Sequence, residues 1–276
     1  MRKKLWIVVV LAALILTGGL LWYDASVSSL TRIRTRNLTV SDATIPVDFE
    51  NVRIVFFSDI HAYANTDASD LDRILTRINR LAPDILIFGG DLLDKTTPIL
   101  TEDQINELSN FLRSMDAPLG KYAVLGLHDE NQTQAIKTIY NQSDFELLEN
   151  QVLHLHNLGE TYLRLAGVSS SLDKTTDLSF LTPQPDTYTI LVSALPDIAD
   201  NLGEADVDLL LSGSTHGGQV YLPLIGSTYN VGSMKYRSGK YTVNQTTLIV
   251  SNGLGTSGDK YRLFADPDLW AIRLQP

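Results

Sequence analysis

The most apolar stretch of the chain lies at its N-terminus, where LWIVVVLAALILTGGLLW carries no charge from Leu5 to Trp22. At about 1.5 Å of rise per residue, a helix of this length nearly crosses the roughly 30 Å hydrocarbon layer of a bilayer. Trp6, Trp22 and Tyr23 stand near the ends of the run, as in an interfacial aromatic belt. The run exceeds the usual apolar core of a cleaved signal peptide, which stays the alternative. The pattern predicts a transmembrane anchor over residues 5–23.

Buried apolar runs alternate with helical periodicity through the first half of the body. The segments VRIVFFS, DILIFGG and YAVLGL, which begin at Val52, Asp84 and Tyr122, predict strands covered on both faces. Behind the capping residue Asp67, apolar residues recur at helical spacing, and residues 101–115 and QTQAIKTIYNQ predict two further helices. This alternation predicts parallel strands joined by right-handed crossovers.

The remaining apolar segments are shorter and lie closer together. The alternating segment TRIRTRNLTV predicts a strand from Thr31 to Val40 with its arginines on the solvent side. The second half predicts mostly strands, with one short helix near residues 196–202; its strand segments are FELLEN, QVLHLHN, YLRLAGV, YTILVSA, VDLLLSG, QVYLP, TLIVSNG and LWAIRL. This number of strands fits two sheets packed face to face with helices outside. The predicted fold is therefore an α/β, four-layer α-β-β-α sandwich preceded by one transmembrane helix.

The composition narrows the chemistry. The formal net charge of -10 argues against nucleic acid as a partner, because phosphate-backbone binding needs a basic face. A small phosphorylated substrate stays compatible if a metal supplies positive charge. The chain has no cysteine, which excludes disulfides, thiolate nucleophiles and cysteine-based zinc or iron–sulfur sites.

Polar residues that can bind metals gather at the carboxyl ends of the predicted strands, where open α/β sheets bind their ligands. They are Asp59, His61, Asp91, Asp94, His128, Asp129 and His216. Each alone is typical of a turn or cap, so the prediction depends on their convergence. Carboxylates combined with imidazoles suit Zn, Mn or Fe better than Mg or Ca, which prefer oxygen alone.

Four motifs, SDIHAY, PDILIFGGDLLD, VLGLHDE and SGSTHGGQV, resemble in order and spacing those of the calcineurin-like metallophosphoesterase superfamily. The chain looks most like the membrane-associated bacterial branch, whose tail is similar to SNGLGTSGDKYRLFADPDLWAIRL. In that family, two adjacent metal ions lie at the strand ends. The resemblance implies that one ion is bound by Asp59, His61, Asp91 and His216.

The ligands that the family reserves for the second ion are missing. Leu127 stands where the family has asparagine, Ala194 at the position of an isolated histidine, and Ser214 in place of the first histidine of the last motif. Leucine and alanine cannot coordinate, and serine is a poor ligand unless deprotonated. The two spare imidazoles, His154 and His156, share one face of a predicted strand and are expected in solvent. The resemblance thus implies one divalent transition metal and no second site.

Three functions stay open at this point. His128 resembles the family's histidine that acts on the leaving oxygen or the phosphoryl transition state, and Asp94 matches the carboxylate that orients it. Their retention is compatible with a weak, single-metal phosphoesterase. The alternatives are a pseudoenzyme that binds a phosphorylated ligand or a protein at the cell surface, and an interaction module with remnant polar residues. Lys235, Arg237 and Arg262 are candidates for holding substrate oxygens, with surface salt bridges as the alternative.

The chain divides into four parts along the sequence. We expect a cytoplasmic tail, a transmembrane anchor, a connecting segment with an edge strand, and a metallophosphoesterase-like domain, over residues 1–4, 5–23, 24–50 and 51–276. The charges at the N-terminus favour a cytoplasmic end, although the arginines of TRIRTR lie in the window that the positive-inside rule counts. We expect the domain outside a bacterial cell membrane, with the bilayer as partner and an envelope lipid or another phosphorylated molecule as candidate substrate.

Overall fold

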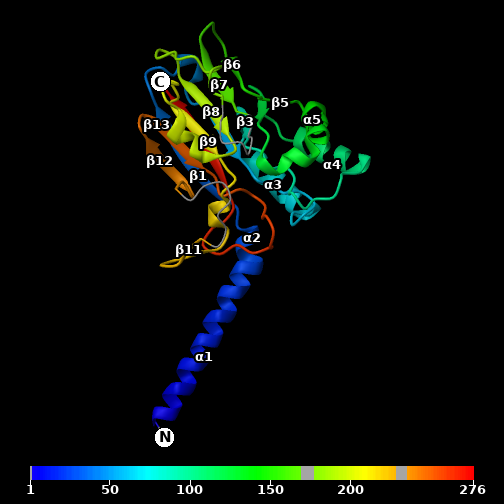
Figure 1. Cartoon of the computed structure of the whole chain (residues 1–276), viewed down its shortest axis with the longest axis vertical. Helices are drawn as coiled ribbons and strands as arrows, with labels where there is room; N and C mark the ends of the chain where they lie inside the picture. Colours follow the sequence, from blue (N-terminus) through cyan, green and yellow to red (C-terminus); the bar gives the residue numbers. More distant parts are fainter. Residues whose placement is uncertain (1, 169–176, 228–234) are drawn as a thin grey trace.

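The computed structural model describes residues 2–168, 177–227 and 235–276. Helix α1 (Arg2–Tyr23) continues through the π-helical turn η1 (Asp24–Ser28) into α2 (Ser29–Thr31). Together they form one helix of 30 residues that projects from one end of the body (Figure 1). None of its most apolar stretch is buried, and it is long and apolar enough to cross a membrane.

The first sheet has six strands in the order β1-β14-β2-β3-β4-β5. Their bounds are β1 (Arg34–Ser41), β2 (Arg53–Phe57), β3 (Ile85–Phe88), β4 (Lys121–Ala123), β5 (Phe145–Leu147) and β14 (Asp268–Gln275). The strands from β2 to β5 are parallel, as the alternating pattern predicts, whereas β14 is antiparallel to β2. β1 pairs with β14 along its whole length and lies at the sheet edge. It begins at Arg34 instead of the predicted Thr31 because the preceding helix extends through Thr31.

Three helices cover one face of this sheet (Figure 1): α3 (Ala68–Arg80), α4 (Glu102–Arg113) and α5 (Thr133–Gln142). α3 begins with a capping box in which the side chains of Asp67 and Asp70 each accept from the other's backbone N–H. Its apolar face buries Leu71, Ile74 and Ile78 against the sheet, and each such side chain contributes about 1.5–3 kcal/mol.

The second sheet also has six strands, in the order β12-β13-β9-β8-β7-β6. Their bounds are β6 (Gln151–His156), β7 (Tyr162–Gly167), β8 (Thr189–Ser193), β9 (Leu209–Ser212), β12 (Gly239–Val243) and β13 (Thr246–Val250). The two sheets pack face to face through a shared apolar core that includes Phe56, Ile87, Ile190 and Leu211. The short helix η4 (Pro196–Asn201) packs on the outer face of the second sheet through Ile198. The predicted four-layer sandwich is confirmed.

Several short elements connect the layers: η2 (Val47–Phe49), η3 (Leu127–Gln132), η5 (His216–Gly218), β10 (Tyr221–Leu222) and β11 (Gly226–Ser227). The predicted strand QVYLP forms only β10, which pairs with β11 in a hairpin outside both sheets. The sequence pattern did not predict β12, an edge strand whose residues alternate between half-buried and exposed.

Candidate metal centre

The loops that follow β2, β3 and β9 carry the predicted metal ligands in a strained backbone conformation. Asp59, His61, Asp91, Ser214 and His216 all have left-handed φ angles, at 55°, 50°, 57°, 63° and 50°. Residues other than glycine rarely adopt this region, and such strain gathers at functional sites. The turns direct polar side chains across the strand ends instead of leaving them along the strand direction.

The predicted ligands Asp59, His61, Asp91 and His216 come together in space. Nε2 of His61 lies 3.0 Å from Nε2 of His216, which lies 3.8 Å from Oδ1 of Asp59. Ligand atoms of Asp59, His61 and His216 lie within 4.8 Å of one another, and so do those of His61, Asp91 and His128. The four predicted ligands are at most 2% exposed. His61 belongs to both groups, so its imidazole lies near the carboxylate of Asp59 and near that of Asp91.

The donors of Asp59, His61 and His216 fit a divalent metal ion. Two nitrogens that each bind one ion at about 2.0–2.1 Å stand roughly 3 Å apart, and the Nε2 atoms of His61 and His216 have this separation. Burial, and then the charge of Asp91, raise the pKa of Asp59 to about 7. Two buried carboxylates thus repel each other in the protein alone, and a cation between them would relieve that repulsion.

The two imidazoles have different electrostatic surroundings. Burial lowers the pKa of His61, but the neighbouring Asp94, Asp91 and Asp59 outweigh it and raise that pKa overall. The pKa of His216 is well below its usual value, because burial, and then the nearby His61 and Arg262, disfavour its charged form. A neutral imidazole is the form that binds metals, so His216 is already in its ligating state.

The positions that the sequence leads us to expect at a second metal are Ala194, Leu127 and Ser214. Ala194 is fully buried at the end of β8, and Leu127 is half-buried at the start of η3. Ser214 donates from its backbone N–H to both carboxylate oxygens of Asp59 at 3.1 Å, and from Oγ to Oδ2 of Asp91 at 3.1 Å. The serine therefore holds the two carboxylates by hydrogen bonds.

The spare histidines do not supply replacements within the described residues. His154 and His156 are exposed on β6, where the ring of His154 stacks on Tyr162 with centroids 4.1 Å apart. Neither belongs to a group of candidate ligands among the described residues. Their predicted position on the solvent side of a strand is confirmed.

Asp94 contacts His61 more closely than His128. Its Oδ2 lies 3.1 Å from Nδ1 of His61, without hydrogen-bond alignment, and 4.0 Å from Nδ1 of His128. Ser257 Oγ donates to the same oxygen at 2.7 Å, and Thr96 donates to Oδ1. Although burial alone would raise the pKa of Asp94, contacts with His61, Thr96 and Ser257 lower it well below its usual range. The carboxylate therefore lies beside Nδ1 of His61, the position that carboxylates take beside metal-binding histidines.

Asp129, which the sequence identifies only as a strand-end residue, is buried and holds the loop after β3 by hydrogen bonds. Its carboxylate accepts from the backbone N–H groups of Asp91, Leu93 and Gly126, at 2.9, 3.2 and 2.8 Å. Burial, and then Asp91, raise its pKa to about 7. A Cβ on Gly126 would lie 2.2 Å from the backbone nitrogen of Asp91, so the two loops can touch only because Gly126 has no side chain.

The three cations suggested for substrate binding have other contacts. Arg262 is fully buried and donates to backbone carbonyls, among them that of His216 at 3.2 Å, so it forms no surface salt bridge. Arg237 donates to the carbonyl of Gly217 at 2.6 Å. Lys235 pairs with Asp200 on the surface, which is the alternative given by the sequence. Arg262 and Arg237 thus support the loop that carries His216.

Comparison with known proteins identifies a family. The family described as calcineurin-like phosphoesterase matches residues 52–244. The "Uncharacterized metallophosphoesterase YkuE" of Bacillus subtilis is 29% identical over 88% of this chain and 86% of its own length. The "UDP-2,3-diacylglucosamine pyrophosphatase LpxG" of Chlamydia muridarum is 25% identical over 86% of this chain and 88% of its own.

A relative from cattle and a solved structure extend the comparison. The bovine "Transmembrane protein with metallophosphoesterase domain" is 27% identical over 84% of this chain but only 54% of its own length. The crystal structure of TT1561 from Thermus thermophilus is 12% identical, with a TM-score of 0.49 over 74% of this chain and 90% of its own. At that score the structural likeness adds no argument about function.

Proposed function

The chain belongs to the calcineurin-like phosphoesterase family, and from this premise we propose that it is a membrane-anchored metallophosphoesterase that works slowly with a single divalent metal ion. The reaction is hydrolysis of a phosphodiester or phosphomonoester. The grouping of Asp59, His61 and His216, with Asp91 in a second group that shares His61, supports this proposal most directly.

In this proposal Asp59, His61, Asp91 and His216 hold one Mn, Fe or Zn ion. When bound, such an ion supplies Lewis acidity toward a phosphoryl oxygen. The remaining residues fix the geometry: Asp94 orients His61, and Asp129 braces the loop that carries Asp91. These contacts keep the ligands in place before substrate arrives.

We assign His128 to the leaving oxygen of the substrate. Its backbone N–H donates to Oδ1 of Asp91 at 2.7 Å, and its ring centroid lies 5.1 Å from that of His61. Burial lowers the pKa of His128 despite the nearby carboxylate of Asp91. The imidazole is thus neutral near pH 7 and acts by donating a hydrogen bond from a ring N–H.

The second candidate is a pseudoenzyme that binds a phosphorylated ligand or a protein partner without turnover. Two observations favour it. The 4.0 Å between Asp94 and His128 is too long for the hydrogen bond that would orient a catalytic imidazole. The Oδ2 of Asp91, which would serve a second ion, already accepts from Ser214.

The placement in the membrane is part of the proposal. Residues 5–23 span the bilayer, residues 1–4 stay in the cytoplasm, and residues 24–50 connect to the domain of residues 51–276 on the outer side of a bacterial cell membrane. The apolar α1 and the relative named as a transmembrane protein support a membrane location. The relative named as a diacylglucosamine pyrophosphatase supports a phosphorylated envelope lipid, or a related small molecule, as substrate.

The experiment uses the full chain in detergent or nanodiscs. Metal content is measured together with hydrolysis of bis(4-nitrophenyl) phosphate, for the parent, for His61→Ala and for His154→Ala, which removes an exposed imidazole on β6. We expect about one metal per parent chain and slow turnover that falls at least 100-fold in His61→Ala alone. A parent that holds metal but is inert supports the pseudoenzyme, and a parent that holds no metal contradicts both functions.

A further inference from the structure

The anchor helix and the body are joined rigidly. The backbone N–H of Arg262 donates to the carbonyl of Ala25 at 2.9 Å, and Ser29 Oγ donates to Oδ1 of Asp266 at 2.9 Å. Arg32 bridges Asp24 and Asp266 through ion pairs of 3.1 and 2.9 Å. Because the helix continues to these contacts, a membrane around α1 would lie against the end of the body that carries Arg262 and Asp266.

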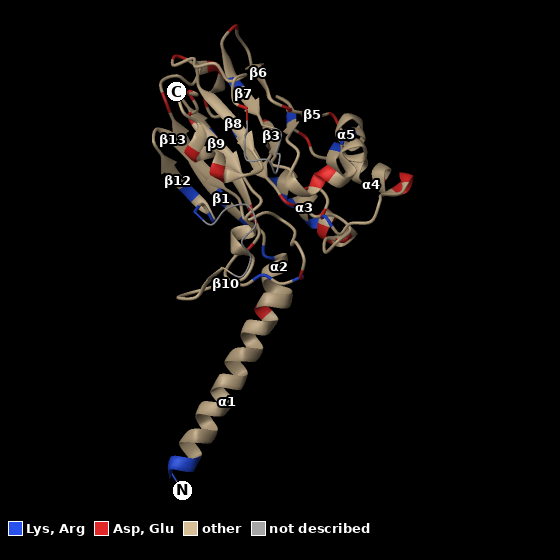
Figure 2. Cartoon of the chain, viewed as in Figure 1, with Lys and Arg blue, Asp and Glu red and all other residues tan. Residues whose placement is uncertain are grey.

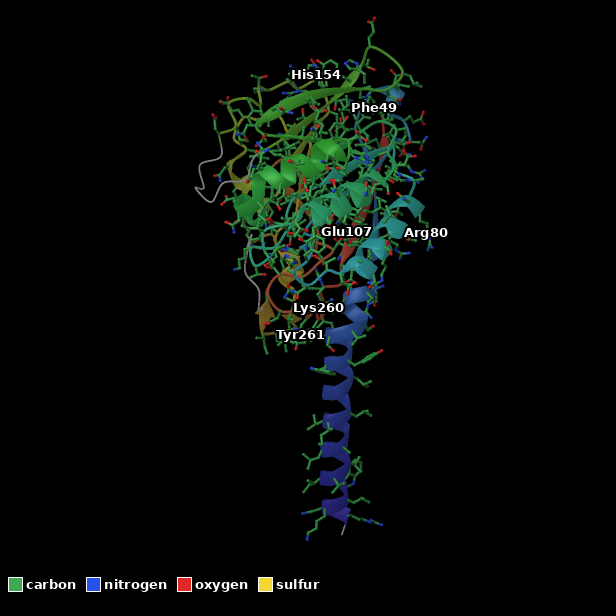
Figure 3. The ribbon with its side chains drawn as sticks, turned by 90° about the vertical axis from the view of Figure 1, so that its right-hand side faces the viewer. Phe49, Arg80, Glu107, His154, Lys260 and Tyr261 are labelled. Atoms are coloured by element: carbon green, nitrogen blue, oxygen red, sulfur yellow. The ribbon has the colours of Figure 1, made fainter. Side chains whose placement is uncertain are left out.

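Large apolar side chains are exposed on that face. Leu224 and Ile225, at the tip of the β10–β11 hairpin, are 106% and 80% exposed, and Tyr261 and Phe264 are 43% and 55% exposed. The hairpin extends beside the junction of α1 and α2, and Tyr261 lies at the same end of the body when the molecule is turned (Figures 1 and 3). Exposed apolar residues that gather beside a membrane anchor indicate contact with lipid.

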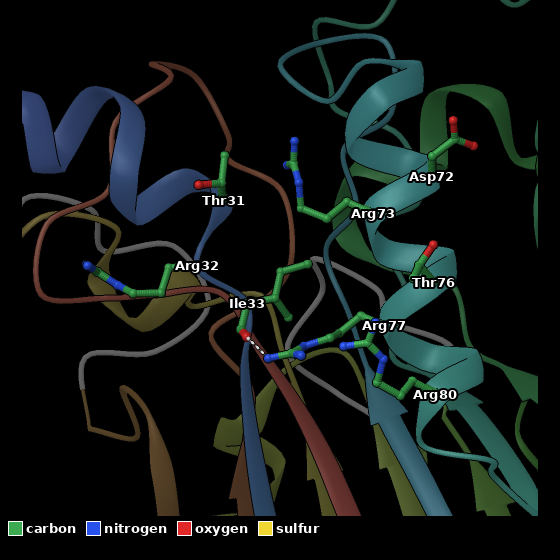
Figure 4. Close-up of a pocket in the computed structure, with 8 residues that line it drawn as sticks. All are labelled: Thr31, Arg32, Ile33, Asp72, Arg73, Thr76, Arg77 and Arg80. Carbon is green, nitrogen blue, oxygen red and sulfur yellow. Dashed lines mark hydrogen bonds between the residues drawn. The ribbon is translucent and has the colours of Figure 1, made fainter.

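A basic groove lies at the same end of the body. It has a volume of about 510 Å³ between the end of the anchor and α3, and its lining includes Arg32, Arg73, Arg77 and Arg80 (Figure 4). Arg77 donates to the carbonyl of Ile33 and has no carboxylate among its described contacts. The chain as a whole carries a net charge of -10, yet the groove is lined by four arginines and one carboxylate, that of Asp72, and Arg73 also pairs with Asp70; Figure 2 shows basic and acidic residues near the base of the anchor. This local charge suits the phosphates of an anionic lipid surface.

We propose that the anchor-proximal face of the body docks on the bilayer surface. In this arrangement Leu224 and Ile225 enter the apolar edge of the leaflet, and the groove of Arg73, Arg77 and Arg80 binds lipid headgroup phosphate. The metal-site loop leads directly into this face, since the residues after η5 form the hairpin and Val220 bridges to Leu263. The proposal rests on α1 spanning the membrane, as proposed above, but not on catalytic activity.

The first test measures the depth of the hairpin in a bilayer. Because the chain has no cysteine, Ile225→Cys in the full chain gives a single site for a fluorescent label in nanodiscs that contain brominated phospholipid. Leu158→Cys is the matched control, since Leu158 is 87% exposed in the connection between β6 and β7, away from the anchor (Figure 1). We expect several-fold stronger quenching by the lipid bromines at position 225, and protection there from aqueous iodide. Equal quenching at the two positions overturns the docking proposal.

The second test addresses the groove. Binding of dihexanoyl phosphatidylglycerol to the detergent-solubilised full chain is compared for the parent, for Arg77→Gln with Arg80→Gln, and for Arg113→Gln with Lys137→Gln. The second pair removes the same charge from α4 and α5. At roughly fivefold per basic side chain at a lipid surface, the groove pair should weaken binding about tenfold or more, and the control pair little. If the two double variants weaken lipid binding equally, or if the parent binds inorganic phosphate as tightly as the lipid, the groove is not a lipid-binding site.

Discussion

The two halves of the strand-end site share a scaffold but differ in chemistry. On one side, Asp59, His61 and His216 direct ligand atoms to within 4.8 Å of one another from strained, left-handed turns. On the other side, Ala194 and Leu127 carry no donor, while Asp91 and His128 form a second group of candidate ligands with His61. The difference teaches that neighbouring strand-end loops of one fold can carry either coordinating or apolar side chains.

The largest expected effect is a difference in metal affinity between variants of two residues in one loop, His216 and Ser214. Loss of a residue that only contacts a ligand typically weakens metal binding about 10–100-fold. His216→Ala removes a predicted ligand itself, so it should weaken metal binding by more than this. Ser214→Ala lies two positions away and removes only a hydrogen bond to Asp91, so it should keep the metal and lose about 1 kcal/mol of stability. Metal content after dialysis, measured with thermal unfolding, distinguishes them. Equal metal loss in both variants would contradict the division of the site.

Introducing donors at the three positions expected to serve a second metal should create a second metal-binding site. The triple variant Leu127→Asn, Ala194→His and Ser214→His should raise metal content from one to two ions per chain. A second ion stabilises the transition-state charge by several kcal/mol, so phosphodiester hydrolysis should rise on the order of 100-fold or more. Leu127→Asn alone serves as the control, because one added donor cannot complete a site. A folded triple variant that still binds one ion shows that more than these three side chains was lost.

Metal removal should make stability depend on pH. The pKa of Asp59 is raised from its ordinary value to about 7 in the protein without metal, so the fold favours the protonated carboxyl. That preference stabilises the metal-free fold at low pH and is lost as pH rises through about 7. Between pH 5 and pH 8, chelator-treated protein should therefore lose a few kcal/mol of unfolding free energy relative to metal-loaded protein. Urea unfolding at both pH values measures the difference, and a difference that stays constant with pH refutes the expectation.

A smaller effect is expected outside the ligand shell. Asp94→Asn removes the charge beside Nδ1 of His61 and should weaken metal binding about 10–100-fold. Ser257→Ala is the matched control, because it removes one hydrogen bond to the same carboxylate and keeps the charge. Metal titration of both variants measures the two affinities. If Asp94→Asn reduces turnover but leaves metal affinity unchanged, the carboxylate serves His128 instead of His61.

The fold and the position of the candidate ligands at the strand ends could be predicted because they depend on local pattern, whereas the assignment of ligands to one ion follows from the family resemblance and stays a prediction. Apolar runs marked the buried strands, and residues such as Asp59 and His216 stand directly after them. β12 was missed because a short edge strand buries little apolar surface, which leaves only a weak alternation of polar and apolar residues. QVYLP reads as a strand, but its pairing in a separate hairpin depends on tertiary contacts.

The supports of the site could not be predicted from residue types. Arg262 donates to carbonyls brought together by several loops, and no sequence pattern marks a carbonyl as an acceptor. Asp129 likewise accepts from backbone N–H groups of two separate loops. The carboxylate of Asp94 lies about one ångström closer to Nδ1 of His61 than to Nδ1 of His128. The spacing of motifs along the sequence cannot predict so small a difference in distance.

Arg262 has one further consequence, for how the protein can be handled. Its backbone reaches Ala25 in the anchor, while its guanidinium holds the carbonyl of His216. A soluble fragment that starts after Thr31 would therefore lose a partner of the residue that secures a metal ligand, and Asp266 would lose its bond to Ser29. We therefore expect removal of the helix to disturb the loop that carries His216, so that metal binding measured on such a fragment differs from that of the full chain.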